Sequence, residues 1–202
     1  MRIRTAVFET SAPGETYYPS ATLPEFAFIG RSNVGKSSLV NMLTSTAGLA
    51  KVSATPGRTR LINFFRINDL WRLVDLPGYG YAAGPKKDKA EFQQAAVEYL
   101  AHRPNLACVF VLIDSRLAPQ PIDLEFLGWL ATCSVRFALV FTKVDKQPRE
   151  VAKSVAAFTE RLAKERLAIP EIFRSSSETQ AGRAEILHAI DVILTGGVTP
   201  RL

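Results

Sequence analysis

Residues 30–37 read Gly-Arg-Ser-Asn-Val-Gly-Lys-Ser, a complete Gly-x-x-x-x-Gly-Lys-Ser phosphate loop. The glycines let the backbone turn so that N–H groups point at phosphates, while Lys36 supplies a positive charge and the Ser37 hydroxyl can bind magnesium. The segment Glu25-Phe-Ala-Phe-Ile29 before the loop predicts a buried strand, and 38–43 after it predicts a helix, which is the order the motif requires. We therefore expect a nucleoside triphosphate ligand. The expected contacts are Gly30, Arg31, Ser32, Asn33, Val34, Gly35, Lys36 and Ser37.

Strand and helix patterns alternate along the rest of the chain. Strands are expected at 61–67, 71–75, 106–114, 135–141 and 171–174, and helices at about 87–101, 121–133, 148–167 and 184–195. Asn68-Asp69 predicts a hairpin turn between the first two of these strands. The pattern predicts an α/β fold whose mostly parallel six-stranded sheet has one antiparallel strand and helices on both faces.

Length and composition indicate one domain. The chain has 202 residues, of which 47% are hydrophobic and 22% charged, as in an ordinary globular protein. We expect an N-terminal extension at 1–22, with a candidate extra edge strand at 4–10, a main domain at 23–195 and a tail at 196–202. The longest apolar run, 106–113, is too short to span a membrane, and residues 1–10 lack the apolar core of a signal peptide, so a cytoplasmic protein is expected. Cys108 and Cys133 lie in apolar surroundings and are expected to be buried reduced thiols.

Positive charge gathers around the phosphate loop. Residues 31–89 contain ten Lys or Arg and three Asp or Glu, a local net charge of +7, against +6 for the whole chain. The basic residues beyond the need of one triphosphate are Lys51, Arg58, Arg60, Lys86, Lys87 and Lys89. One interpretation is a polyanionic partner, most plausibly RNA, and the other is a solvated basic face that aids solubility.

The segment Asp75-Leu76-Pro77-Gly78 follows a predicted strand. A nucleotide hydrolase places at such a point the acidic residue that holds magnesium and the glycine whose N–H meets the γ-phosphate. Alone the tetrapeptide is typical of a simple strand-ending turn, but its position one hairpin after a phosphate loop favours the nucleotide interpretation.

A second polar segment, Thr142-Lys143-Val144-Asp145, ends another predicted strand and so reaches the ligand-binding edge of the sheet. The Asp145 carboxylate can accept two parallel hydrogen bonds from the N1–H and amine of guanine, whereas adenine offers no such pair of donors. Lys143 can lay its methylene stem along the purine. The motifs together favour GTP over ATP. The polar loop 176–178 after the last strand is a candidate for contacting the guanine carbonyl oxygen.

The ordered motifs resemble those of translation-factor-type small GTPases, and among these the bacterial EngB/YsxC family of ribosome-biogenesis GTP-binding proteins. Residues 30–39, 55–65, 75–82 and 142–146 match the family's pattern, and the resemblance covers roughly residues 23–195. It implies a three-layer P-loop GTPase domain.

The resemblance also implies further site residues. Thr59 would be the first-switch threonine, binding magnesium together with Ser37 and Asp75. Further nucleotide contacts would come from the first switch and from the base-binding turn, namely Gly57, Arg58, Thr59, Arg60, Leu61, Ser175, Ser176 and Ser177. Ser175 stands where the family usually has phenylalanine before its paired serines.

Two residues bear on hydrolysis. Tyr79 follows Gly78 where many GTPases have a glutamine that orients the attacking water, so slow intrinsic hydrolysis is expected. Asn33 matches the asparagine with which cation-dependent relatives help to hold potassium, or it only stabilises the loop. The candidates for roles in hydrolysis are Lys36, Thr59, Gly78 and Asn33.

The resemblance implies a magnesium-dependent GTPase switch. Its partner would be the large ribosomal subunit or its RNA, bound through the basic switch region, with a requirement in normal cell division and septation. We expect a monomer that does not bind DNA. One alternative is a nucleotide-gated adaptor for a protein at the division septum, with hydrolysis incidental. Another is an ATP-using phosphotransferase built on the same loop.

Overall fold

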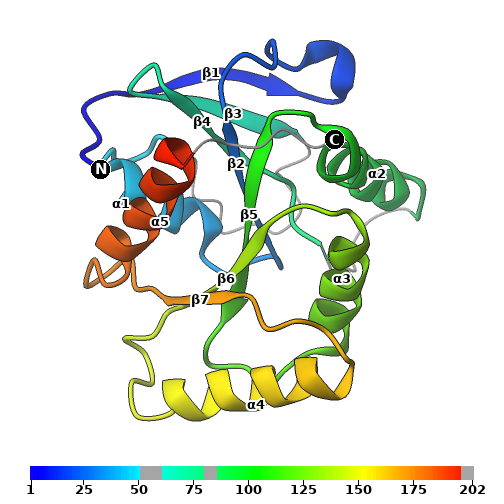
Figure 1. The fold of residues 1–202 in the computed structure, drawn as a ribbon, viewed down its shortest axis with the longest axis vertical. Helices are drawn as coiled ribbons and strands as arrows, with labels where there is room; N and C mark the ends of the chain where they lie inside the picture. Colours follow the sequence, from blue (N-terminus) through cyan, green and yellow to red (C-terminus); the bar gives the residue numbers. More distant parts are fainter. Residues whose placement is uncertain (51–60, 80–85, 197–202) are drawn as a thin grey trace.

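A computed structural model of the protein describes residues 1–50, 61–79 and 86–196. The elements follow one another in a strand and helix alternation (Figure 1). In chain order they are β1 (Ala6–Ala12), the 3-10 turn η1 (Glu15–Tyr17), β2 (Glu25–Gly30), α1 (Lys36–Thr44), β3 (Ile62–Ile67), β4 (Trp71–Asp75), α2 (Lys86–His102), β5 (Leu106–Asp114), α3 (Pro121–Thr132), β6 (Phe137–Thr142), α4 (Val151–Lys164), β7 (Glu171–Arg174) and α5 (Arg183–Thr195).

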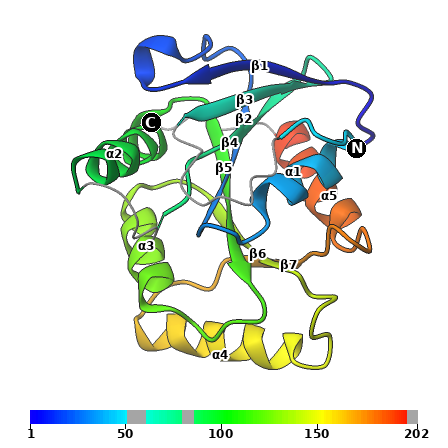
Figure 2. The ribbon, with the colours of Figure 1, turned by 180° about the vertical axis from the view of Figure 1, so that it is seen from behind.

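The described strands form one sheet in the order β1-β3-β4-β2-β5-β6-β7. β3 runs antiparallel to both of its neighbours, and the other four pairings are parallel. Figures 1 and 2 show helices on both sides of this sheet. The predicted fold class is confirmed, with one correction: the sheet has seven strands, not six.

The seventh strand is β1, at the edge of the sheet. It pairs with β3 from Ala6 opposite Ile67 to Ala12 opposite Ile62, and a bulge between Phe8 and Thr10 shifts the register. The exposure of β1 does not follow the period-two alternation on which strand prediction rests, because Val7 and Phe8 in succession are both about half exposed, at 53% and 50%. This irregular pattern explains why the sequence indicates only a candidate strand here.

Each face of the sheet has its own apolar core. On β2, Phe26 and Phe28 pack among side chains of α1 and α5, whereas Ala27 and Ile29 pack among side chains of α2, α3 and α4. The apolar run Phe26–Ile29 of β2 therefore reflects a strand covered on both faces. Both cysteines are free, and Cys108 is buried as expected, whereas Cys133 is only partly buried because it lies just after the end of α3.

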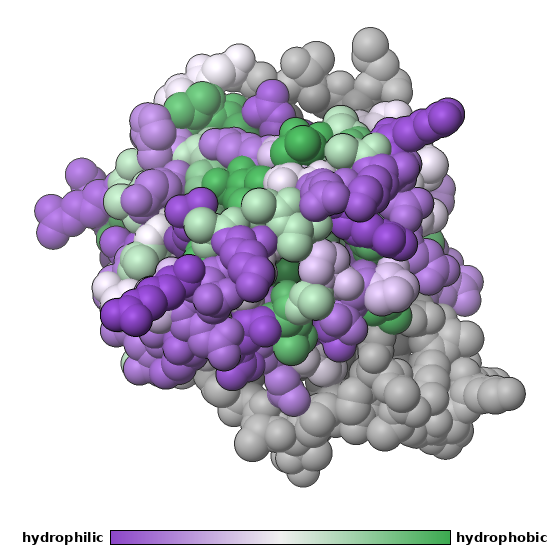
Figure 3. Space-filling model, turned by 90° about the horizontal axis from the view of Figure 1, so that it is seen from below, coloured by the Kyte–Doolittle hydropathy of each residue, from purple (hydrophilic) through white to green (hydrophobic). Residues whose placement is uncertain are grey.

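One face of the molecule is largely polar (Figure 3). Seen from below Figure 1, where α4 lies, the molecule shows mostly hydrophilic side chains around smaller hydrophobic areas (Figure 3). Among residues 1–50, 61–79 and 86–196, no helix combines the length and apolar character needed to cross a membrane.

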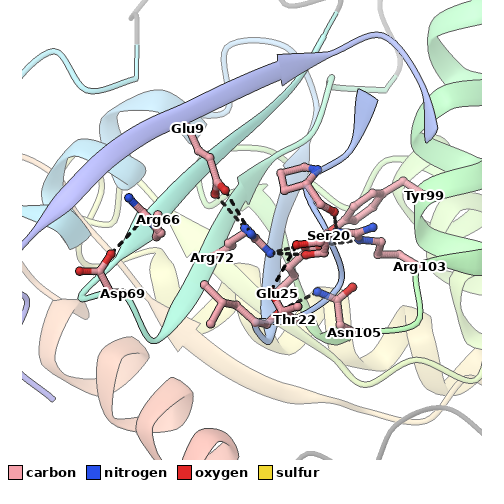
Figure 4. A network of polar contacts seen from close by, with 12 residues as sticks. Glu9, Ser20, Thr22, Glu25, Arg66, Asp69, Arg72, Tyr99, Arg103 and Asn105 are labelled. Carbon is pink, nitrogen blue, oxygen red and sulfur yellow. Dashed lines mark hydrogen bonds and ion pairs between the residues drawn. The ribbon is translucent and has the colours of Figure 1, made fainter. Parts of the chain in front are cut away.

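The ends of β2 have different roles. At its first residue, the buried Glu25 lies between Arg72 and Arg103, and Arg72 also reaches Glu9 of β1 (Figure 4). At its last residue, Gly30, the phosphate loop begins. From β2 the chain first adds β4 on one side and later β5 on the other, so the carboxyl end of β2 opens into a topological switch point, where ligands of such sheets bind.

Candidate functional site

The phosphate loop fills the turn between β2 and α1. Asn33 and Gly35 both have left-handed backbones, with φ of 64° and 101°, a region that glycine and asparagine tolerate best. A Cβ on Gly30 would lie 2.8 Å from the carbonyl oxygen of Leu112. Glycine at 30 therefore lets the loop begin in close contact with β5.

The loop after β6 is tied to the phosphate loop by two side chains. The Thr142 hydroxyl donates to the carbonyl oxygen of Val34 at 2.7 Å. The Lys143 ammonium donates to the carbonyl oxygen of Asn33 at 2.6 Å, and its stem passes Gly35, whose Cβ would lie 3.7 Å from Lys143 Cε. The two predicted motifs are thus in direct contact.

Asp114, the last residue of β5, holds Lys143 in this position. Its Oδ2 accepts hydrogen bonds from Lys143 at 2.9 Å and from the Arg116 guanidinium at 2.7 Å. Burial opposes ionisation of this carboxyl group, but hydrogen bonds from Arg116 and Lys143 outweigh it and lower the pKa of Asp114 to about 2. Lys143 therefore has a charged partner throughout the physiological pH range.

Asp145 lies beside the loop that follows β7. A hydrogen bond from the Ser176 hydroxyl, joined by one from Lys146, lowers the pKa of the Asp145 carboxyl group. The same Ser176 oxygen accepts the backbone N–H groups of Glu178 and Thr179, each at 3.2 Å. Ser176 thus orients an ionised Asp145 from within an ordered turn.

The three serines after β7 differ in their surroundings. The Ser175 N–H donates to the carbonyl oxygen of Phe141 at 2.7 Å, and the Ser176 N–H donates to that of Ala181 at 3.1 Å. The Ser175 hydroxyl is buried without a hydrogen-bond partner among the described residues. Ser175 therefore continues the sheet, and the turn itself starts at Ser176.

Lys36 and Asp75 form an ion pair between α1 and the end of β4. Burial lowers the pKa of the Lys36 ammonium to about 7. The Asp75 carboxylate is buried, and its Oδ2 accepts a 3.4 Å hydrogen bond from Asn63, whose own amide oxygen accepts one from Ser11 at 2.6 Å. Ser37 follows Lys36 in α1, and Lys36 is paired with Asp75, so this end of the site offers a serine hydroxyl and an aspartate carboxylate. Hard oxygen donors of this kind fit magnesium.

Gly78 lies directly against the phosphate loop. A Cβ on this residue would approach the Gly30 carbonyl oxygen to 2.6 Å. The next residue, Tyr79, pairs with Arg31 in an isolated parallel bridge, and its hydroxyl donates to Asp123 of α3 at 3.0 Å. Tyr79 occupies the position at which many GTPases have the water-orienting side chain, and its side chain packs against α3.

Part of the expected site lies outside the described residues. This holds for Gly57, Arg58, Thr59 and Arg60, for Lys51, and for the side chains of Lys86, Lys87 and Lys89. Leu61, the last of the expected first-switch contacts, is exposed at the start of the following described segment.

Among the described residues, Asn63, Asp114 and Asp123 contact the site through polar side chains and were not predicted. Asp114 had a usable signal, because it is a carboxylate at the carboxyl end of a predicted strand, as Asp75 is. Asn63 is one polar residue inside a strand, and Asp123 is one acid in a helical first turn, so neither pattern distinguishes it from an ordinary residue.

Comparisons with known proteins agree with this geometry. The family described as 50S ribosome-binding GTPase matches residues 25–143. A probable GTP-binding protein EngB of Christiangramia forsetii is 48% identical, covering 96% of this chain and 98% of the relative. The protein of the same description from Phocaeicola vulgatus is 49% identical, with coverage of 96% and 97%.

Solved structures support the fold. A crystal structure of a probable GTP-binding protein engB matches with a TM-score of 0.70 at 21% identity, covering 86% of this chain and all of that one. Era in complex with MgGDPNP and a segment of 16S ribosomal RNA matches with a TM-score of 0.66 at 21% identity, covering 83% of this chain and 55% of that one. The family match and the near-full-length relatives decide the assignment: the chain belongs to the 50S ribosome-binding GTPase family and, within it, to the EngB group of GTP-binding proteins.

Proposed function

We propose that this GTP-binding protein is a magnesium-dependent, slow GTPase that acts as a switch in assembly of the large ribosomal subunit. By this proposal it works in the cytoplasm and is needed for normal cell division and septation. The observation that carries the nucleotide part is the contact between the phosphate loop and the loop after β6, in which Thr142 and Lys143 donate hydrogen bonds to the carbonyl oxygens of Val34 and Asn33. These bonds keep the proposed base site at a set distance from the proposed phosphate site.

Guanine is recognised by Asp145 and the turn after β7. The ionised Asp145 accepts the N1–H and the amine of the base, and Ser176 keeps its carboxylate oriented. Because the N–H groups of Ser175 and Ser176 already donate within the fold, we assign the contact with the guanine carbonyl oxygen to the N–H of Ser177.

The phosphates and magnesium are held at the other end of the site. Lys36 would contact the outer phosphates, Ser37, Thr59 and Asp75 would hold magnesium, and the N–H of Gly78 would meet the γ-phosphate. When bound there, the metal ion would supply positive charge that stabilises the phosphates. Negative phosphate oxygens beside Lys36 favour its protonated form and so oppose the effect of burial on its pKa.

Slow hydrolysis follows from the position of Tyr79. Its side chain is only 7% exposed, and its hydroxyl is bonded to Asp123, so it is not directed at an attacking water. Two roles for Asn33 are separable by measurement. Faster hydrolysis in potassium than in sodium buffer would support a potassium ion at Asn33. Equal rates would leave Asn33 only the role of stabilising the left-handed loop conformation, which its φ of 64° indicates.

The base assignment is tested by Asp145→Asn. An amide at this position presents a donor where guanine needs an acceptor, so affinity should shift from guanosine toward xanthosine nucleotides. The matched control is the exposed Asp69→Asn in the β3–β4 turn, which should retain guanosine preference. Unchanged base preference in Asp145→Asn would instead support the ATP-using phosphotransferase.

The partner is tested by sedimentation with ribosomal particles. The family description, the relative crystallised with 16S ribosomal RNA, and the +7 net charge of residues 31–89 support an RNA-rich partner. Binding to large-subunit particles should require a GTP analogue rather than GDP, and should weaken steeply with salt. Salt-insensitive binding to a septal protein would favour the adaptor instead.

A further inference from the structure

Tyr79 is fixed in the structure by three contacts. Its backbone pairs with Arg31 of the phosphate loop. Its ring stacks on Phe126 of α3, with centroids 4.4 Å apart and planes at 18°. Its hydroxyl donates to Asp123 Oδ1 at 3.0 Å, and the side chains of Tyr79 and Asp123 are both buried. We call Tyr79, Asp123, Phe126 and Arg31 the Tyr79 latch.

Burying the carboxylate of Asp123 at this position is energetically unfavourable. It lies in the first turn of α3 and is 3% exposed. Its Oδ2 is 4.0 Å from the Arg31 guanidinium, a loose ion pair. Burial raises the pKa of the Asp123 carboxyl group, although the Tyr79 hydroxyl and Arg31 favour its charge. A buried carboxylate with so few partners contributes little to stability, so a role in the position of Tyr79 is the better account of it.

The residue next to the latch is Gly78. Its backbone is so close to the phosphate loop that an added Cβ would lie 2.6 Å from the Gly30 carbonyl oxygen and 3.5 Å from the Ser32 nitrogen. Since Tyr79 is anchored both to α3 and to Arg31, the backbone of Gly78 is held in place from its C-terminal side.

We propose that Tyr79 and Asp123 are positioning residues that hold the N–H of Gly78 ready for a γ-phosphate and thereby raise the preference for GTP over GDP. The inference rests on the proposed function, in which Gly78 contacts the γ-phosphate. A segment fixed before binding loses less conformational entropy when the triphosphate binds. GDP has no γ-phosphate, so its affinity gains nothing from the latch.

The test measures affinities for a non-hydrolysable GTP analogue and for GDP in Tyr79→Phe and Asp123→Ala. Tyr79→Phe keeps the ring stack and removes only the hydroxyl. In both variants the affinity for the analogue should fall roughly three- to tenfold, the range expected for one hydrogen bond, while that for GDP stays within about twofold. The double variant should resemble either single one, because both remove the same bond. Asp123→Asn keeps an oxygen acceptor and should recover part of the loss.

Tyr99→Phe is the matched control. The Tyr99 hydroxyl donates to buried Glu25 at 2.8 Å, a similar bond at the opposite end of β2. Its loss should lower thermal stability and leave the ratio of the two affinities unchanged.

Gly78→Ala separates the latch from the proposed function. If this variant lowers affinity for the analogue while Tyr79→Phe does not, the latch inference is wrong and the proposed function stands. Equal losses for analogue and GDP in Tyr79→Phe would show a structural role only, and tighter analogue binding would show that the latch holds Gly78 away. If Gly78→Ala changes neither affinity, the γ-phosphate contact fails, and the inference fails with it.

Discussion

Asp114 keeps its charge through hydrogen bonds. Its side chain is 8% exposed, yet its two oxygens accept bonds from Arg116 and Lys143, and the pKa lies at about 2. Because this pKa is lower than the ordinary value of about 4, the charged group stabilises the folded state above pH 4. That contribution is lost as the pH falls from about 4 to about 2.

We predict that Asp114→Asn lowers the free energy of unfolding at pH 7 by about 1–2 kcal/mol, after allowance for solvent screening. The difference from the unsubstituted protein should shrink between about pH 4 and pH 2. Urea unfolding at pH 7, 4 and 2.5 measures it. The exposed Asp69→Asn serves as the control, with an effect within about 0.5 kcal/mol. A difference that does not vary with pH would rule out this account of Asp114.

For single residues, the sequence predicted which side chains come together at the sheet edge, but not where the side chain of Tyr79 points. Asp145, Lys143 and Thr142 were located because their motif ends a strand, and the structure brings them to the phosphate loop and the turn at Ser176. That Tyr79 points under α3 follows from a partner 44 positions away, and local sequence contains no sign of such a pairing.

Arg183 joins two helices that are far apart in the chain. As the first residue of α5, it donates from Nε to the Met42 carbonyl oxygen at 2.8 Å and from Nη2 to the Leu43 carbonyl oxygen at 3.0 Å. These carbonyl groups belong to the last turn of α1, where regular intrahelical hydrogen bonds end, although the Met42 carbonyl oxygen also accepts the N–H of Ser45 at 3.2 Å. Arg183 thus caps the helix that starts at the phosphate loop.

We predict that Arg183→Ala lowers the free energy of unfolding by about 1.5–3 kcal/mol, because two charge-assisted bonds are lost. Arg183→Lys should recover only part, since an ammonium lacks the planar fork. Hydrogen exchange should increase at the C-terminal end of α1. The control is Arg161→Ala, which removes an exposed pair with Glu165 and should cost no more than about 0.5 kcal/mol. Equal losses in Arg183→Ala and Arg161→Ala would contradict the capping role.

Substitution by alanine at two glycines should change the free energy of unfolding in opposite directions. Gly182, before α5, has a φ of 79°, and its Cβ would lie 2.1 Å from the Arg174 carbonyl oxygen. Gly128, inside α3, has nothing within 4 Å of its Cβ. Gly182→Ala should cost more than about 3 kcal/mol or prevent folding, and Gly128→Ala should stabilise by about 0.5–1 kcal/mol. Thermal unfolding of both variants measures this, and a stable Gly182→Ala would disprove the close approach.

Element types were easier to predict than their ends. The hairpin at Asn68-Asp69 is confirmed, and both residues have positive φ, 51° and 57°, as a type I′ turn requires. The helix expected at 148–167 spans only Val151–Lys164, because a turn occupies residues before it and Arg166 has a left-handed backbone after it. Such ends depend on caps and turns rather than on apolar periodicity.

Across the whole molecule, the buried charges at the start of β2 tie the N-terminal segment to the domain. Glu25 is fully buried and accepts bonds from Arg103 at 2.6 and 2.7 Å and from Tyr99 at 2.8 Å. Arg103 also donates to the Pro19 carbonyl oxygen, and Arg72 to that of Ser20 (Figure 4). The network lies at the end of β2 opposite the phosphate loop.

We predict that Glu25→Gln lowers the free energy of unfolding by about 3–5 kcal/mol, because it leaves buried Arg103 without its carboxylate partner, while Arg72 keeps its ion pair with Glu9. Nucleotide affinity of the folded variant should be unchanged. Chemical unfolding and GDP titration measure the two quantities, with the exposed Glu165→Gln as control. Weaker GDP binding by folded Glu25→Gln would show that the two ends of β2 are coupled.

The pairing of β1 has a consequence for the order of folding. Its residues are synthesised before the rest of the sheet, yet their partners in β3 lie between 50 positions (Ala12 with Ile62) and 61 positions (Ala6 with Ile67) further along the chain. The Asn68 side chain of the β3–β4 turn also accepts the N–H groups of Arg4 and Thr5. The strand nearest the N-terminus must therefore wait for the β3–β4 hairpin, so during translation it does not join the sheet until that later segment has been made.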